Sequence, residues 1–133
     1  MSMTELKARI TAELETPDST PAPLTDATPA ELAEAIALFL DNKRGREIKI
    51  INMNGKTDIC DYMVLATGTS NTHVNTLGGE VEYEMNRRGI DPLHTEGRDN
   101  NTWTVLDYSH VLVHVFTRET RDFYNLDKLY GDN

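Results

Sequence analysis

The segment at residues 61–70, which reads DYMVLATGTS, constrains the fold of this chain more than any other feature. Its apolar side chains alternate between the two faces of a predicted strand. One face carries Tyr62, Val64 and Ala66, and the other carries Met63 and Leu65. Apolar residues on both faces are typical of a strand in the middle of a sheet that is covered on each side. Helix-capping residue types follow at residues 68–71, so the pattern predicts a buried strand, a tight turn and a helix.

Length and charge limit the class of protein. With 133 residues, 38% of them hydrophobic, the chain has room for one domain plus an appendage. A net charge of −9 disfavours direct binding to DNA or another phosphate backbone and favours a basic partner, although it would also simply keep the protein soluble. The chain has no apolar stretch of membrane-spanning length, and residues 1–15 lack the core of a signal peptide. We therefore expect a cytoplasmic protein, which agrees with its single cysteine, Cys60.

The first 28 residues differ in composition from the rest. Leu6, Ile10 and Leu14 are spaced by four, which predicts a short, isolated and marginal helix over residues 1–15. Residues 16–29 hold all but one of the five prolines, a composition typical of an extended linker that buries no core. We predict that residues 1–28 are a flexible N-terminal extension with a Pro-rich linker, and that residues 29–133 form the domain.

The domain alternates helical and strand patterns. A capping box at residues 28–31 predicts the start of its first helix, and the other elements follow from apolar periodicity and turn residues. The predicted order is a helix at 29–42, strands at 47–51 and 62–67, a helix at 71–88, a short strand within 90–96, strands at 103–108 and 111–117, and a terminal helix around 123–129. This order predicts a single α/β (α+β) domain with a mixed sheet of about five strands flanked by helices.

Two local details accompany this prediction. Residues 52–55 read as the tight turn of a hairpin that leads into the central strand. Gly78 and Gly79 lie inside the helix that follows Ser70, where each glycine is unfavourable by about 1 kcal/mol relative to alanine. A close approach of this helix either to the sheet or to a partner would explain the pair.

No catalytic or metal-binding pattern emerges. Residues 68–70 could hold an anion at a helix N-terminus, but they lack a P-loop ending, and a plain capping turn is favoured. Asp58 and Asp61 are three residues apart, so they do not form the carboxylate pair that a nucleotidyltransferase needs for two metal ions. The histidines lack metal-ligand spacing. We predict no enzyme activity, metal or cofactor. The alternative is a nucleotidyltransferase-like or nucleotide-binding enzyme that uses the turn at Gly68 to Ser70.

Several short motifs occur in a characteristic order. They are residues 61–70, His73-Val74, Glu96-Gly97, Trp103-x-x-x-Asp107, Val111-x-Val113-His114-Val115-Phe116, and Arg121-x-x-Tyr124-x-Leu126-x-x-Leu129-Tyr130. Together they resemble the ribosomal silencing factor family, also called Iojap or YbeB-like proteins, over about residues 31–130. The family generally has tryptophan where this chain has Tyr130, and the Pro-rich leader lies outside the shared pattern.

The resemblance implies a fold similar to that of nucleotidyltransferases, without their chemistry. It implies a translational repressor that binds the large ribosomal subunit through its ribosomal protein fourteen and sterically blocks joining of the small subunit when nutrients are scarce. Family members can also self-associate, so a homodimer is a further expectation. An acidic domain suits a basic ribosomal protein, because complementary charge helps encounter and register.

The predicted partner-binding residues come from the same motifs. Trp103 and Asp107 share one strand face, where they would supply an aromatic anchor beside a charge. A tryptophan buried in the core is an equally good interpretation of Trp103. The full predicted set is Trp103, Asp107, Glu96, Asp61, Thr69 and Ser70.

Overall fold

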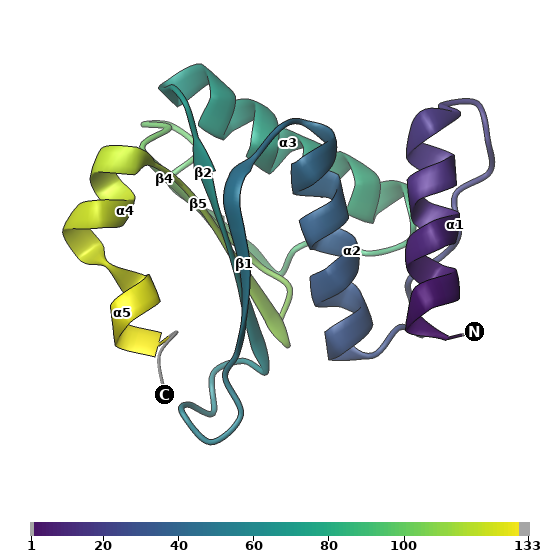
Figure 1. The fold of residues 1–133 in the computed structure, drawn as a ribbon, viewed down its shortest axis with the longest axis horizontal. Coiled ribbons are helices and arrows are strands. Elements are labelled where there is room, and N and C mark those ends of the chain that lie inside the picture. Colours follow the sequence, from purple (N-terminus) through teal and green to yellow (C-terminus); the bar gives the residue numbers. More distant parts are fainter. Residues whose placement is uncertain (1, 131–133) are drawn as a thin grey trace.

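The computed structural model describes residues 2–130, which form helices on both sides of one sheet (Figure 1). In chain order the elements are α1 (Met3–Glu15), α2 (Pro29–Asn42), β1 (Arg46–Asn52), β2 (Tyr62–Gly68), α3 (Asn71–Arg87), β3 (His94–Glu96), β4 (Trp103–Asp107), β5 (Val111–Thr117), α4 (Arg118–Tyr124) and α5 (Leu126–Tyr130). The strands are hydrogen-bonded in the order β1-β2-β5-β4-β3. The predicted α+β class with a five-stranded mixed sheet is confirmed.

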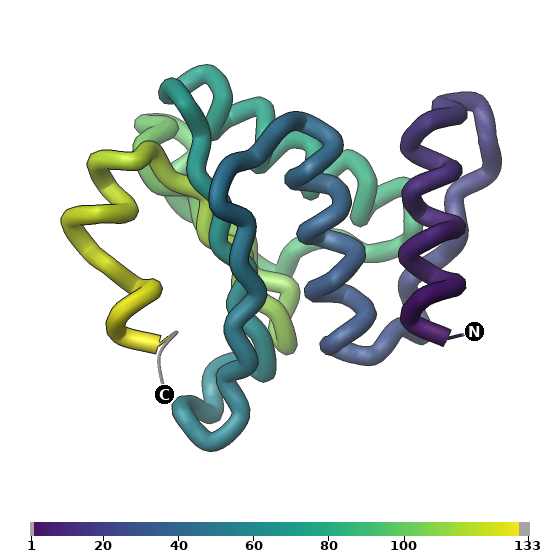
Figure 2. The backbone as a smooth tube through the Cα atoms, in the orientation of Figure 1, coloured from purple at the N-terminus to yellow at the C-terminus, as the bar shows by residue number. Residues whose placement is uncertain are grey.

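β2 lies inside the sheet, as its two apolar faces predict. It pairs with β1 in the antiparallel direction and with β5 in the parallel direction, so that Leu65 lies between Lys49 and His114. All of its residues after Tyr62 are buried. Helices α2 and α3 cover one face of the sheet, and α4 and α5 lie on the other, as the backbone tube shows (Figure 2).

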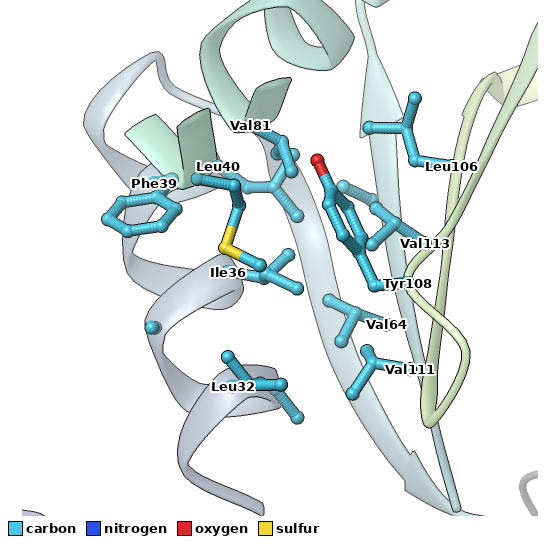
Figure 3. Close-up of a cluster of buried hydrophobic side chains, with 14 of the residues drawn as sticks. Leu32, Ile36, Phe39, Leu40, Val64, Val81, Leu106, Tyr108, Val111 and Val113 are labelled. Atoms are coloured by element: carbon cyan, nitrogen blue, oxygen red, sulfur yellow. The ribbon is translucent and has the colours of Figure 1, made fainter. Parts of the chain in front are cut away.

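The larger core lies between the sheet and the pair α2 and α3. Side chains from both helices and from β2, β4 and β5 meet there (Figure 3): Ile36, Leu40, Val64, Val81, Leu106 and Val113. A second, smaller cluster lies on the opposite side of the sheet, where Met63, Leu65 and Phe116 pack with Leu126 of α5. The two clusters correspond to the two faces of β2 that the alternation of apolar residues predicts.

Capping residues set the ends of the main helices. The Thr28 hydroxyl accepts a hydrogen bond from the Glu31 N–H, and the Thr28 N–H donates to the Glu31 carboxylate at 2.8 Å, which completes the predicted capping box. The Ser70 hydroxyl accepts from the His73 N–H at 3.0 Å and begins α3. Beyond the other end of α3, Gly89 adopts a φ of +96°, a conformation that glycine tolerates best.

The glycine pair in α3 admits a close approach to the sheet. A Cβ atom on Gly78 would lie 3.4 Å from the Thr104 methyl group on β4 and 3.8 Å from the Arg98 guanidinium. Of the two predicted explanations for the pair, contact with the sheet and the loop before β4 is the one that the structure shows.

Two predicted details are wrong. The connection between β1 and β2 is a longer loop over residues 53–61 rather than a tight turn, and the Met53 N–H donates to the Asp61 carbonyl across its base at 2.8 Å. The terminal helix is divided into α4 and α5 by Asn125, which adopts a φ of +50°. Phe123 and Leu129, expected on its buried stripe, are instead 79% and 65% exposed.

The N-terminal segment packs on the domain, which differs from the isolated helix and core-free linker that the sequence predicts. Leu6 and Ile10 of α1 are buried in the larger core, and Leu24 from the Pro-rich segment is buried with them. The Arg88 side chain, fully buried after α3, holds the segment in place: its Nη1 lies 2.6 Å from Glu13 Oε1 and its Nη2 lies 3.2 Å from Glu84 Oε1. The domain boundary after residue 28 stays a prediction.

Among residues 2–130, no helix has both the length and the hydrophobicity needed to cross a bilayer.

Candidate partner-binding face

The face of the sheet that carries α4 and α5 is only partly covered. In β4, Thr104 and Leu106 point to the larger core and are fully buried, whereas Trp103, Val105 and Asp107 on the opposite side are half-buried. Cross-strand pairing places Val105 beside both Glu96 on β3 and His114 on β5. We call this surface the open face and define it as Glu96, Trp103, Val105, Asp107, Leu112 and His114.

Trp103 is the fixed centre of the open face. Its indole N–H donates to His114 Nδ1 at 3.0 Å. The indole ring lies 4.6 Å from the ring of Tyr124 on α4 and 5.8 Å from that of Phe116, measured between ring centres. Trp103 is therefore neither a core tryptophan nor a free surface one. A half-exposed aromatic ring that is already immobilised loses little conformational entropy when a partner covers it.

Hollows flank the indole on both sides. One, of about 440 Å³, is lined by polar and apolar side chains that include Glu96, Asn100, Thr102 and Tyr124. The other, of about 290 Å³, is lined mainly by apolar side chains that include Met53, Ile59, Met63, Leu112 and Leu126, together with His114. We call the second one the apolar hollow. Trp103 lines both hollows, so a partner can place side chains on either side of the ring.

His114 is neutral and has a defined tautomer. Burial lowers the pKa of its imidazole to about 4, so the ring carries no charge at neutral pH. Its Nδ1 accepts the Trp103 hydrogen bond, and therefore Nε2 carries the proton. Within the described part of the chain, that Nε2–H has no hydrogen-bond partner. The open face thus contains a buried donor without an acceptor.

Acidic side chains lie at the edge where β2 begins and β4 ends. Asp107 accepts from the Ser109 N–H at 2.7 Å, and an Asp61 carboxylate oxygen lies 2.9 Å from His110 Nδ1. Burial raises the pKa of the Cys60 thiol, and the charges of Asp61 and Asp107 raise it further, because both carboxylates are close to it. This edge therefore has a negative potential next to the apolar hollow.

The predicted partner-binding residues fall into two separate groups. Glu96, Trp103 and Asp107 lie on the open face, and Asp61 lies beside them at the acidic edge. Thr69 and Ser70 lie instead in the turn between β2 and α3. Their part in partner binding, like that of the other four residues, stays a prediction.

The turn at Gly68 to Ser70 is built as a helix cap. The Thr69 N–H, a donor that an anion would need, is hydrogen-bonded to His73 Nδ1 at 2.8 Å, and Ser70 caps α3. Acidic as well as basic side chains line the adjacent cavity, since Glu47 and Glu119 accompany Arg118. This geometry matches the capping interpretation. Elsewhere in residues 2–130, no three His, Cys, Asp or Glu side chains gather as a metal site would require.

Sequence reasoning missed His114 and Tyr124 as parts of this face. His114 appears in the sequence as the polar residue of an apolar strand and as a member of the motif at residues 111–116, but neither signal places it beside Trp103. Tyr124 is the last residue of α4, and it packs on Trp103 because of where α4 lies on the sheet, which spacing along the chain does not reveal.

Comparison with known proteins agrees with this architecture. A family model described as "Ribosomal silencing factor during starvation" matches residues 26–133. The ribosomal silencing factor RsfS of Bacillus subtilis is 35% identical over 96 residues, which are 72% of this chain and 81% of the relative. The mouse protein named "Mitochondrial assembly of ribosomal large subunit protein 1" is 27% identical over 73% of this chain and 44% of its own length.

Solved structures resemble the fold as well. The crystal structure of a protein from Chromobacterium violaceum superposes with a TM-score of 0.77 at 27% identity, over 80% of this chain and 88% of that one. A crystal structure from Bacillus halodurans gives a TM-score of 0.65 at 29% identity, over 71% of this chain and 90% of that one. The match to the family model covers most of the chain, and we conclude that the chain belongs to the ribosomal silencing factor family.

Proposed function

We propose that this protein represses translation by docking its open face on ribosomal protein fourteen of the large ribosomal subunit, which sterically blocks joining of the small subunit without catalysis. One observation carries the proposal: Trp103 is fixed and half-exposed between two hollows, on the face of the sheet that α4 and α5 cover only in part. Tryptophan is among the residue types that are enriched at the hot spots of protein interfaces.

Family membership supports a ribosome-associated role in translational silencing. The name of the mouse relative refers to assembly of the large ribosomal subunit, which favours that subunit as the binding site. Charge favours the same kind of partner. The chain carries a net charge of −9, and the carboxylates of Asp61, Asp107 and Glu96 lie on or beside the open face, where they would attract a basic protein.

The arrangement of layers suits a steric mechanism. The open face lies on one side of the sheet, while α2, α3 and finally α1 are stacked on the other (Figure 1). Packed helices lie about 8–10 Å apart, so each layer adds about that thickness. If the open face binds the large subunit, these layers project away from it into the space that an incoming small subunit would occupy.

The test is a joining experiment with purified components. The protein is sedimented with isolated large subunits, and small subunits are then added at a magnesium concentration that drives joining. We expect the protein to be retained on the large subunit and the yield of joined ribosomes to fall. Normal joining, with the protein left in the supernatant, would remove the basis of the proposal. Self-association stays a separate prediction, which sedimentation equilibrium of the free protein measures.

A further inference from the structure

The apolar hollow beside Trp103 has the properties of a binding pocket for a side chain. Its volume of about 290 Å³ lies just below the range of pockets that hold drug-sized molecules, which run from about 300 to 1,000 Å³. It opens between β5, the loop at residues 53–61 and α5, and apolar side chains dominate its wall. An opening of this size and lining suits one large apolar side chain.

A buried donor contributes to the same wall. His114 is 92% buried, and its Nδ1 is held by the Trp103 indole, so the ring cannot rotate without breaking that hydrogen bond. Nε2–H has no acceptor among residues 2–130 and is closed off from solvent, so a group that reaches it must first displace the side chains that cover it. Because a buried donor without an acceptor is destabilising, a group that enters the hollow with a carbonyl oxygen would relieve an existing deficit.

The charges around the opening indicate the kind of segment that would enter. Cys60 forms part of the wall, and both Asp61 and Asp107 are close to its thiol. Asp58 lies in the same loop. Carboxylates thus border the opening beside Cys60, while the Lys56 ammonium lies at the α5 side, where it donates to the Tyr130 carbonyl. The side beside Cys60 complements a segment that carries basic residues beside its apolar one.

We propose that the apolar hollow receives one apolar side chain from a basic segment of ribosomal protein fourteen, and that His114 Nε2–H donates a hydrogen bond to a backbone carbonyl oxygen of that segment. This inference rests on the proposed function and names the subsite within it. His114 then has two linked tasks: Nδ1 positions Trp103, and Nε2 recognises the partner.

The first experiment fills the hollow without disturbing its wall. Cys60→Met places a longer apolar side chain in existing space, so we expect unchanged or higher thermal stability with at least tenfold weaker binding to isolated large subunits. Ala27→Met is the matched control, because it extends a half-buried alanine into a hollow of about 430 Å³ beside α1, away from the open face. The control should bind as the wild type does.

The second experiment observes the imidazole directly in the wild-type protein. Nitrogen-15 spectra of labelled histidine are recorded before and after addition of purified ribosomal protein fourteen, and His114→Phe identifies the His114 signals by their loss. We expect the Nε2 proton to move downfield and to exchange more slowly with water in the complex. An unchanged Nε2 signal in a saturated complex would overturn the assignment of a carbonyl partner.

The outcomes separate this inference from the proposed function. Wild-type protein that fails to bind large subunits contradicts both. Wild-type protein that binds and blocks joining, together with Cys60→Met that binds equally well, leaves the proposed function in place and overturns the hollow as its subsite. Weak binding by Cys60→Met with normal folding, alongside a shifted Nε2 signal, supports the hollow as the site that recognises the partner.

Discussion

The two faces of the sheet differ in how their most buried ionisable side chain is partnered. On the covered face, the Arg88 guanidinium contacts Glu13, Glu84 and the Ala22 carbonyl and lies 5.2 Å above the Phe39 ring, so its charge is compensated inside the protein even though its Nε–H has no acceptor in the described residues. On the open face, His114 makes one hydrogen bond to Trp103 and leaves Nε2–H without an acceptor in the described residues. The first arrangement stabilises the fold, whereas the second is completed only by a partner.

The surroundings of the two groups match this difference. Arg88 holds a helix and a linker against the domain, so the surface around it is closed by α1 and the Pro-rich segment. Around His114 the indole is half-exposed and hollows remain on either side. A change on the covered face should therefore reduce stability and spare binding, whereas a change to an exposed side chain of the open face should reduce binding more than stability; His114, which is buried, should affect both. Four predictions test this separation.

Removal of Arg88 should have the largest effect on stability. Arg88→Met removes the buried cation that Glu13 and Glu84 share and leaves them only their partly exposed partners Arg9 and Arg87, which should lower the free energy of unfolding by about 3–5 kcal/mol. Urea unfolding measures this loss, and binding to large subunits by the folded fraction should not change. Arg9→Met is the control, because Arg9 pairs with the same Glu13 from an exposed position and should contribute less than about 1 kcal/mol. Equal effects of the two variants would contradict a special role for Arg88.

Acid should destabilise the open face through His114. The unfolded chain binds a proton below its ordinary pKa of 6.5, while the buried imidazole stays neutral down to about 4, so stability falls as the pH falls through this range. The free energy of unfolding should fall by about 3 kcal/mol in total over this range. Unfolding measured above about pH 5 avoids most carboxylate titration. His114→Phe should flatten this dependence; a variant with the wild-type slope would show that another group titrates.

Loss of the indole should weaken binding more than it weakens the fold. Trp103→Ala removes the proposed anchor and should reduce affinity for isolated large subunits about 30-fold, the size expected of an interface hot spot. Tyr83→Ala is the matched control, because Tyr83 is an aromatic residue on α3 that is 59% exposed. Quantitative sedimentation gives both affinities. If the two variants bind equally well, the anchor does not lie on the open face.

The smallest effect should come from the acidic edge. Asp61→Asn with Asp107→Asn keeps the side-chain oxygens that contact His110 and Ser109 but removes both charges. The association rate at low salt should fall a few-fold, and the difference should vanish at high salt, because steering by charge is screened. Asp18→Asn with Asp26→Asn in the N-terminal segment removes the same charge away from the open face. Similar rate losses in both pairs would indicate that only net charge matters.

Local sequence patterns predicted the parts of the fold that depend on neighbouring residues. The alternation in residues 62–67 predicted an inner strand, and Thr28 and Ser70 predicted two helix starts, because each signal lies within a few positions of its effect. Arg88 shows why the remainder was missed. An arginine at the C-terminal end of a predicted helix is typically exposed there, where its charge interacts favourably with the helix dipole. Its partner Glu13 is 75 positions away in the sequence.

The candidate site likewise has parts that local sequence patterns predict and parts that they do not. Trp103 and Asp107 were predicted to share a strand face, because the period of a strand is fixed at two residues. The pairing of Trp103 with His114 and the hollows beside it depend on the register between β4 and β5 and on where α5 lies. Neither can be derived from spacing along one strand.

Hydrogen–deuterium exchange of the protein, free and bound to isolated large subunits, tests the central claim most directly. Binding through the open face should slow exchange in β4, β5 and the loop at residues 53–61, and leave α1 and α2 unchanged. Slower exchange in α1 and α2, with β4 and β5 unaffected, would place the ribosome on the covered face and contradict the account.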